Sequence, residues 1–296
     1  GHRVVHGGEE FIKPTLITPS VLNRLAKYNQ LAPLHNPVNL ACLKVCQQEL
    51  RGVKNIAVFD TAFYQTVPDY IYLYALPLEY YQKYKIRRYG FHGLAHQSAS
   101  EEAARTLNKK LNQLNLVTCH LGSGSSITAI KKGQALDTTM GFTPLEGLTM
   151  SSRAGDLDAM VPLYLMKELK MNLAEIIDLL NKQSGLLGIA GVKDMREVLS
   201  AAGYKIIGFK SRKKINKKSA KLALRMFVYD AQRYINSYLG LLGGADAIVF
   251  TGGIGERSSI IRQLIMNGIK WPVKIKTLVI TADEELLIAR RTIKHA

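Results

Sequence analysis

The stretch VTCHLGSGSSITAIKKGQALDTT, residues 117–139, holds three runs of strand-forming residues separated by two turns. The first turn is a glycine- and serine-rich loop at residues 122–126, and the second is the sequence Lys-Lys-Gly at residues 131–133. This pattern predicts a meander of two or three strands. Backbone amides in the first loop can bind an anion, but a tight hairpin also requires glycine for its own geometry. Taken alone, the stretch favours the second explanation.

Strand-like and helix-like segments alternate over the rest of the chain. Strands are predicted around Val4, around Val58, at residues 246–250 and at residues 275–280. Helices are predicted over residues 18–50 with a proline loop at 32–37, after the loop at 87–93, over 156–203 with two amphipathic stretches, over 219–242, and at the end of the chain. Such alternation is typical of α/β proteins.

The chain carries a formal net charge of +17. This charge suits a nucleic-acid binder, and it equally suits an enzyme whose substrates are all anions. The densest basic stretch, KSRKKINKKSAK at residues 210–221, contains no aromatic residue and no nucleic-acid motif, so we interpret it as a solvated loop leading into a helix. No apolar run reaches the length of a membrane span. We therefore predict no nucleic-acid partner and no membrane partner.

The chain has three cysteines, Cys42, Cys46 and Cys119. An odd number without metal-ligand spacing predicts reduced thiols and a cytoplasmic location. Cys42 and Cys46 are four residues apart in a helix-like stretch and are expected to face the same way. We expect both to be buried as small apolar side chains.

A second glycine turn occurs in IVFTGGIGERS, residues 248–258, between a strand-like run and a helix-like run. Backbone N–H groups at such a turn can face an anion, although many such turns only connect a strand to a helix. The spacing Gly252-Gly253-Ile254-Gly255 does not match GxGxxG, and no Gly-Lys-Ser/Thr follows, so the turn is not a P-loop.

Six polar residues stand in loops after predicted strands: Arg3, His35, Asp60, His92, Arg153 and Asp156. Asp60 ends a buried strand, a common position for a catalytic or metal-binding carboxylate. Arg153 lies among small residues that leave a long cation room to reach a ligand. Phosphoryl transfer requires cations for the phosphoryl oxygens and a carboxylate for a divalent metal ion. This set of residues therefore favours phosphoryl transfer.

Nine motifs occur in the order seen in acetate kinases: GHRVVHGGE, LAPLHNP, FDTAF, RYGFHG, CHLGSGSS, GFTPLEGL, SSRAGDLD, FTGGIGE and EELLIAR. The chain resembles that family from residue 1 to about residue 293, with propionate kinases as near neighbours. The resemblance implies the acetate and sugar kinase/Hsp70/actin superfamily, in which two ribonuclease-H-like domains enclose the active site in a cleft. It implies the reaction ATP + acetate ⇌ ADP + acetyl phosphate by direct in-line transfer with Mg²⁺ or Mn²⁺. It also implies a homodimer formed through the second domain.

The resemblance assigns roles to individual residues. Arg3 and Arg153 would hold the carboxylate and the migrating phosphoryl group, Asp60 would lie near the metal ion, and His92 would donate to the phosphoryl group. The acetate methyl group would contact Val5, Leu34 and Pro144, with Phe91 beside them. The nucleotide would contact His120, Leu121, Gly122, Ser123, Gly124, Asp194, Met195, Arg196, Gly253, Ile254, Gly255, Glu256 and Arg257. The glutamate associated with magnesium would be Glu284, with Glu285 as the adjacent alternative.

Five places depart from the family pattern. Ser123 and Arg257 stand where the family usually has Asn, and Ala154 stands where it has Ser. Tyr64 replaces a usual His, and Leu94-Ala95 replaces a Thr-Ser pair. None of these changes affects Arg3, Asp60, His92 or Arg153, so we expect them to alter nucleotide preference and efficiency rather than the reaction.

Family members begin with a strand and an Asn-Ala-Gly-Ser-Ser-Ser loop, and nothing similar precedes Gly1. Residues 1–62 with the last helix, residues 284–296, would then form part of the first domain. Residues 63–283 would form the second, nucleotide-binding and dimerisation domain. A chain without the phosphate loop is expected to form little acetyl phosphate. Two other hypotheses stay open: an inactive relative that binds a nucleotide or partner protein, and a basic nucleic-acid binder.

Overall fold

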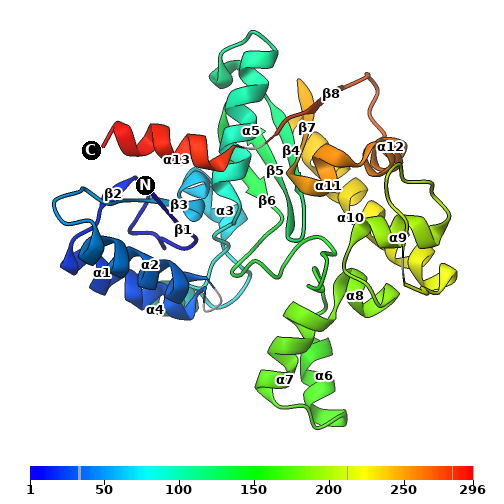
Figure 1. The fold of residues 1–296 in the computed structure, drawn as a ribbon, viewed down its shortest axis with the longest axis horizontal. Helices are drawn as coiled ribbons and strands as arrows, with labels where there is room; N and C mark the ends of the chain where they lie inside the picture. Colours follow the sequence, from blue (N-terminus) through cyan, green and yellow to red (C-terminus); the bar gives the residue numbers. More distant parts are fainter. Residues whose placement is uncertain (33–34, 212, 282, 296) are drawn as a thin grey trace.

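The computed structural model describes residues 1–32, 35–211, 213–281 and 283–295, and it contains two β-sheets with helices packed around them (Figure 1). The alternation of strands and helices confirms the predicted α/β class. No helix of this described part is long and apolar enough to cross a membrane.

The larger sheet has five strands in the order β6-β5-β4-β7-β8. Their bounds are β4 Leu116–Leu121, β5 Ser125–Lys131, β6 Gln134–Thr138, β7 Ala247–Thr251 and β8 Lys276–Val279. The first three form the predicted meander with antiparallel pairing, whereas β7 and β8 run parallel to β4. An antiparallel meander extended by two parallel strands is the ribonuclease-H-like arrangement expected from the resemblance.

Helices cover both faces of this sheet, and the central strands are accordingly buried along most of their length. One face packs against α10 (Lys217–Leu242), α9 (Met195–Ala202) and α12 (Ser259–Met266) in the largest apolar core. The other face packs against α5 (Gly93–Thr106) through Ala99 and Ala103. The helix that was predicted over residues 219–242 is confirmed and begins two residues earlier.

The smaller sheet is built from the first 60 residues, in the order β1-β3-β2. Its strands are β1 His2–Val4, β2 Thr15–Leu16 and β3 Ile56–Phe59, and its helices are α1 Pro19–Ala26 and α2 Asn36–Glu49. These elements share an apolar core of their own, which includes Val4, Leu25 and Phe59. Prolines at the first turns of α1 and α2 explain where both helices begin, because proline has no amide hydrogen to lose there.

The C-terminal helix α13 (Glu284–Ile293) returns to the smaller sheet (Figure 1). Leu287 packs with Val58 of β3 and Leu94 of α5. The Asp283 side chain accepts a hydrogen bond from the backbone N–H of Leu286 and caps the helix. The cap and this packing place Glu284, in the first turn, beside the end of β3.

The helices α6 (Met160–Glu168) and α7 (Leu173–Asp178) project away from both sheets (Figure 1). This region was predicted to hold amphipathic helices, which normally bury an apolar face. None of the α6 residues is buried, and Met160, Leu163, Tyr164 and Leu173 are exposed. The helices are confirmed, but the packing of their apolar residues on the core of the described chain is not.

The expected burial of both helical cysteines is wrong. Cys119 in β4 is buried, whereas Cys42 is exposed and Cys46 is half-buried. Helix α2 packs on the sheet through Leu40 and Leu43, and the two cysteines lie beside that face rather than on it. The other short α-helices are α3 Asp69–Tyr72, α4 Leu78–Tyr84, α8 Gly185–Ala190 and α11 Gly252–Arg257. Short 3-10 helices lie at Lys27–Gln30, Asp60–Tyr64 and Leu111–Gln113, and a π-helix lies at Leu179–Gln183.

Candidate active site

The two glycine turns recognised in the sequence lie next to each other. Strands β4 and β7 are parallel neighbours, and His120 at the end of β4 is opposite Thr251 at the end of β7. Gly252 then adopts φ +76°, and a Cβ atom there would lie 2.8 Å from the carbonyl oxygen of Leu121. Glycine is required at this turn for both reasons. No atom lies within 4 Å of the position that a Cβ of Gly253 would occupy, so this part of the turn is open.

The sequence favoured tight-turn geometry as the reason for glycine in the hairpin between β4 and β5. The structure does not show that reason at Gly122 or Gly124. The N–H of Gly122 donates to the carbonyl of Gly124 at 3.0 Å, but neither glycine has the positive φ that would demand glycine. A Cβ on Gly124 would lie 3.2 Å from Cε1 and Nε2 of His92 and 3.4 Å from Nη1 of Arg153. Contacts this short are tighter than most Cβ contacts, so a larger residue at position 124 would require His92 or Arg153 to shift by a few tenths of an ångström.

Arg3, Asp60 and Glu284 meet where β1, β3 and α13 come together. The Arg3 guanidinium donates to Oδ2 of Asp60 from Nε at 3.1 Å and from Nη2 at 2.8 Å. Its Nη1 lies 2.7 Å from Oε2 of Glu284. Asp60 is buried, and it directly follows the last residue of β3, as predicted. The structure thus brings together three predicted site residues that are far apart in the sequence.

Two carboxylates share the single cation Arg3 in this cluster. Burial opposes the charge on Arg3, but the neighbouring Asp60 and Glu284 raise its pKa overall. The pKa of Glu284 is also raised, because the effect of burial exceeds the opposing effect of Arg3, and the negative charges of Asp60 and Glu285 add to it. The cluster therefore holds negative charge that Arg3 does not balance. Carboxylate oxygens in this arrangement fit a hard divalent cation such as Mg²⁺.

Arg153 has the opposite surroundings. Its Nη1 donates to the carbonyl of Pro144 at 3.3 Å, and among the described residues no carboxylate oxygen lies within 4 Å of its guanidinium. Burial lowers its pKa, and no acidic group counters that effect. A partly buried cation without a counter-ion, beside His92 and Gly124, is a site that favours an anionic ligand.

His92 is held by a chain of side-chain hydrogen bonds. Its Nδ1 lies 2.9 Å from Oγ of Ser126, the same Oγ lies 2.8 Å from Nε2 of His96, and Nδ1 of His96 lies 2.7 Å from Oγ1 of Thr118. His92 itself has φ +57° at the start of α5, a conformation that costs energy for a residue with a Cβ. Ser126, His96 and Thr118 were not among the predicted site residues. The one local signal for Ser126 is strand alternation in β5, which puts it on the opposite face of the strand from Ile127 and Ala129.

The predicted apolar contacts are brought together in part. Val5 and Phe91 belong to one buried cluster, together with Ala32, Met140 and Met150. Pro144 is half-buried, and its carbonyl accepts the hydrogen bond from Arg153. Leu34 lies outside the described residues. Tyr64, which replaces a usual histidine of the family, is buried and donates to the carbonyl of Phe91 at 2.6 Å.

A sequence profile described as the Acetokinase family matches residues 1–294. The chain belongs to the acetokinase family. Acetate kinase from Thermoanaerobacterium thermosaccharolyticum is 45% identical over 317 residues, which cover 99% of this chain and 77% of that relative. The crystal structure of Porphyromonas gingivalis acetate kinase superposes with a TM-score of 0.89 at 38% identity, covering 99% of this chain and 77% of that one. A propionate kinase from Francisella tularensis superposes with a TM-score of 0.88 at 40% identity, covering 98% and 77%.

The nucleotide residues suggested by the acetokinase resemblance lie in two places. Gly253, Ile254, Gly255, Glu256 and Arg257 all belong to α11, directly after β7 and beside the hairpin of His120–Gly124. The Glu256 carboxylate accepts from the backbone N–H of Gly252 at 2.9 Å and closes this turn. Leu121 is buried at the end of β4, whereas Ser123 is exposed at the tip of the hairpin.

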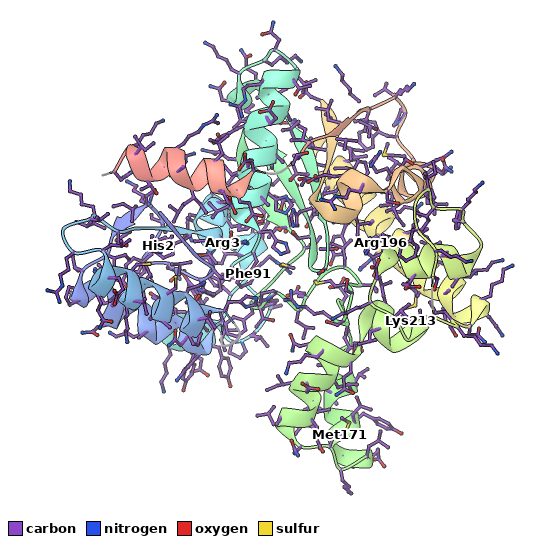
Figure 2. All side chains as sticks on the ribbon, viewed as in Figure 1. His2, Arg3, Phe91, Met171, Arg196 and Lys213 are labelled. Carbon is purple, nitrogen blue, oxygen red and sulfur yellow. The ribbon has the colours of Figure 1, made fainter. Side chains whose placement is uncertain are left out.

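The second place is the start of α9. Asp194 caps this helix and receives two-point hydrogen bonds from Arg196, while Met195 is buried in the main core. In Figure 2, Arg3 and Phe91 are labelled near the middle of the molecule, and Arg196 is well separated from them beside α9. Any nucleotide role of these residues would therefore involve a part of the ligand remote from Arg3.

Electrostatic coupling links the two halves of this acetokinase site. The charges of Arg3 and Arg153 both lower the pKa of His92, after the larger effects of burial and the neighbouring histidines. His35 is affected in the same way, first by burial and then by Arg153 and Arg3, while Asp60 acts in the opposite direction. The charges of Arg3 in β1 and of Arg153, which lies in a loop, thus act on the same two histidines.

Stability of this acetokinase is expected to fall steeply between pH 6.5 and pH 5. Burial lowers the pKa of His6 to about 3 and of His120 to about 4, and it holds the pKa of His96 well below its usual range. Below about pH 6.5 the unfolded chain binds protons that these folded histidines cannot bind, so stability is lost as the pH falls. His6 alone, which is fully buried, would account for about 2 kcal/mol at pH 5.

Urea unfolding curves at pH 8, 6.5 and 5 measure this effect. Burial raises the pKa of Asp137 to about 6 and also raises the pKa of Glu284, so these two carboxylates bind protons more readily in the folded chain and offset part of the loss. The net fall in stability therefore measures the histidines against these two carboxylates. A free energy of unfolding that stays constant from pH 7 to pH 5 contradicts the prediction.

Proposed function

We propose that this protein catalyses the reversible transfer of a phosphoryl group from ATP to acetate, giving ADP and acetyl phosphate. The observation that carries the proposal is the position of Arg153. Its cation has no carboxylate partner among the described residues, and it lies beside His92 and Gly124. Membership of the acetokinase family and the names of the relatives supply the reaction.

In this proposal, ATP or ADP is the nucleotide and a divalent ion, Mg²⁺ or Mn²⁺, assists the transfer. The ion would neutralise charge on the phosphate oxygens when it is bound. Asp60 and Glu284 are the residues that would hold it, directly or through water. Their fit rests on the excess negative charge of the cluster that they form with Arg3.

The reaction needs positioning and charge neutralisation rather than a proton acceptor. A carboxylate oxygen of acetate attacks the terminal phosphorus, and the bond from that phosphorus to the bridging oxygen of ADP breaks. We assign Arg3 to the carboxylate, and Arg153 and His92 to the equatorial phosphoryl oxygens. Val5, Phe91 and Pro144 would enclose the methyl group, and Leu34 remains a prediction outside the described residues.

Nucleotide binding is assigned to the hairpin His120–Gly124 and to residues 253–257. The two segments follow neighbouring parallel strands, which is where open α/β sheets bind ligands. His120 supports this assignment, because its Nδ1 is buried and has no hydrogen-bond partner in the described structure. Asp194, Met195 and Arg196 keep a predicted role in nucleotide contact.

A neutral His92 can donate from Nε2 only if its Nδ1 accepts a hydrogen bond. The hydroxyl of Ser126 can supply that bond while it accepts from Nε2 of His96. Nδ1 of His96 then accepts from Thr118 at 2.7 Å, in place of the longer 3.5 Å hydrogen bond from Thr118 to the carbonyl of Thr128. Ser126→Ala is therefore expected to lower kcat by up to about 10²-fold, the lower end of the cost of losing one donor to developing charge, with little change in KM.

Steady-state kinetics test this prediction, with Ser100→Ala as the matched control. Ser100 is also buried, but its hydroxyl donates to the backbone carbonyl of His96, one turn earlier in α5, and not to the His96 ring. An equal loss of kcat in both variants would show that packing, rather than the His92 tautomer, is responsible.

The proposed function is tested by acetyl phosphate formation from ATP and acetate, in the protein as its gene encodes it. Values of kcat/KM for acetate and propionate decide the substrate, because one methylene group is worth only about 1–3 kcal/mol. A preference for propionate would place the protein with the propionate kinases, to which it is similar at 40% identity. Nucleotide binding without turnover would favour an inactive binding module.

We retain the division into two domains, the first with residues 1–62 and 284–296 and the second with residues 63–283. A homodimer formed through the second domain also remains a proposal. Six apolar residues of the projecting α6–α7 pair are exposed: Met160, Val161, Leu163, Tyr164, Leu173 and Ile177. A second copy would bury this surface. Sedimentation velocity measures the mass, and a monomer at micromolar concentration rejects the dimer.

The three unpaired cysteines are compatible with the proposed cytoplasmic location.

A further inference from the structure

Three side chains of the smaller sheet form a cluster outside the candidate active site. His2 begins β1, and Cys42 and Cys46 lie one turn apart on α2. A ring nitrogen of His2 and the two sulfur atoms lie within 4.8 Å of one another. The sequence showed no metal-ligand spacing, because His2 lies forty residues before the first cysteine and joins it only through the fold.

The segment after His2 runs along α2 and fixes this encounter. The N–H of His6 donates to Oδ1 of Asn36 at 3.0 Å, and the N–H of Val5 donates to Oδ1 of Asn39 at 3.2 Å. The segment and the helix run in opposite directions: His6 contacts the start of α2, and Val5 contacts a residue three positions further along the helix. His2 therefore reaches the turn of α2 that carries Cys42 and Cys46.

Asn55 fixes the tautomer of His2. Its Nδ2 donates to the carbonyl of Val53 at 3.0 Å, so its Oδ1 is the atom that faces His2. Nε2 of His2 lies 2.7 Å from that oxygen and must be the donor. Nδ1 then carries a lone pair. A carbonyl oxygen that orients a histidine through its second nitrogen is the usual outer-sphere partner of a metal-ligating imidazole.

We propose that His2, Cys42 and Cys46 bind one Zn²⁺ ion. Two thiolates and an imidazole are ligands that this ion prefers, whereas Mg²⁺ and Ca²⁺ prefer oxygen. Sulfur atoms bound to one tetrahedral zinc ion lie about 3.8 Å apart, so small rotations of the two cysteine side chains bring the ligands into place. Water completes the coordination, because Cys42 is exposed.

The site joins α2 to β1 next to Arg3. His2 and Arg3 are neighbours on β1, and their backbones pair with Ala57 and Val58 of β3. Zn²⁺ would tie the C-terminal half of α2 to this strand. The N-terminal half of the helix is already held to the segment after β1 by Asn36 and Asn39. Because the ion binds the folded arrangement, it raises the melting temperature in proportion to the logarithm of its concentration.

The test uses the reduced protein without nucleotide or magnesium, titrated with Zn²⁺, and with Co²⁺ as an optical probe. We expect one ion per chain, thiolate-to-Co²⁺ absorption, and protection of two thiols from a thiol reagent. The buried Cys119 is unreactive with or without the ion. Cys42→Ser, at an exposed position that leaves the fold intact, and His2→Gln should each weaken Zn²⁺ binding at least tenfold.

His295→Gln is the matched histidine control, because His295 is exposed and lies in the last turn of the chain. It should bind Zn²⁺ like the parent. Unchanged affinity in Cys42→Ser, a ratio of one ion to two chains, or equal losses in His2→Gln and His295→Gln would each overturn the proposal. A melting temperature that rises with Zn²⁺ equally in the parent and in Cys42→Ser would overturn it too.

Discussion

Replacing Arg153 with glutamine is expected to lower kcat for acetyl phosphate formation by about 10³-fold, the range found when an arginine that stabilises a phosphoryl transition state is removed. Most core substitutions lower the free energy of unfolding, but this one is not expected to. Burial lowers the pKa of Arg153 with no acidic group to counter it, so the folded protein holds this cation at a cost. Removing the charge should leave the free energy of unfolding unchanged or higher.

The combination of lower activity and preserved stability separates a ligand-binding arginine from a structural one. Steady-state kinetics and urea unfolding measure the two quantities on the same preparations. Arg225→Gln, at an exposed position on α10, controls for the loss of one positive charge. If activity and stability of Arg153→Gln fall together, Arg153 holds the fold rather than the substrate.

Replacing Asp60 with asparagine is the second change with a large expected effect. The substitution keeps the shape of a fully buried side chain and removes the charge that accepts two hydrogen bonds from Arg3. Arg3 then keeps only Glu284 as an ionic partner, and the excess negative charge that would hold a divalent cation is lost. We expect kcat/KM to fall by about 10²–10³-fold, with a higher Mg²⁺ concentration needed for half-maximal rate.

The magnesium dependence distinguishes this role from a general loss of structure. Asp246→Asn is the matched control, because Asp246 is also a paired carboxylate, yet it lies at the opposite end of β7 and binds Lys109 and the N–H of Asn115. Its variant should show the magnesium dependence of the parent. A normal magnesium dependence in Asp60→Asn would contradict the assignment of Asp60 to the metal ion.

Much of the candidate site could be predicted from short motifs. Asp60 was placed at the end of a buried strand, and the two glycine turns were placed after strands; the structure has both features. Motif order along the chain identified the family, which the profile match confirms. Such features are local, because a strand followed by a turn leaves a recognisable pattern in a few residues.

Other features could not be predicted, because they depend on which distant segments meet. Ser126 is an ordinary strand residue until α5 places His92 and His96 on either side of its hydroxyl. Cys42 and Cys46 were expected to be buried, since helix periodicity gives a face but not the element that it packs against. His2 became their neighbour only through the pairing of β1 with β3 and the packing of α2.

The stretch at residues 117–139 shows the same division. By itself the sequence determined the meander, because alternating apolar residues and two turns permit little else. Only the tertiary structure decided why Gly124 is glycine. The backbone there has no positive φ, and the space for a Cβ is narrowed by His92 and Arg153, which come from two other segments of the chain. Turn conformation is local and can be read from a few residues, whereas steric exclusion depends on every chain segment that reaches the same point.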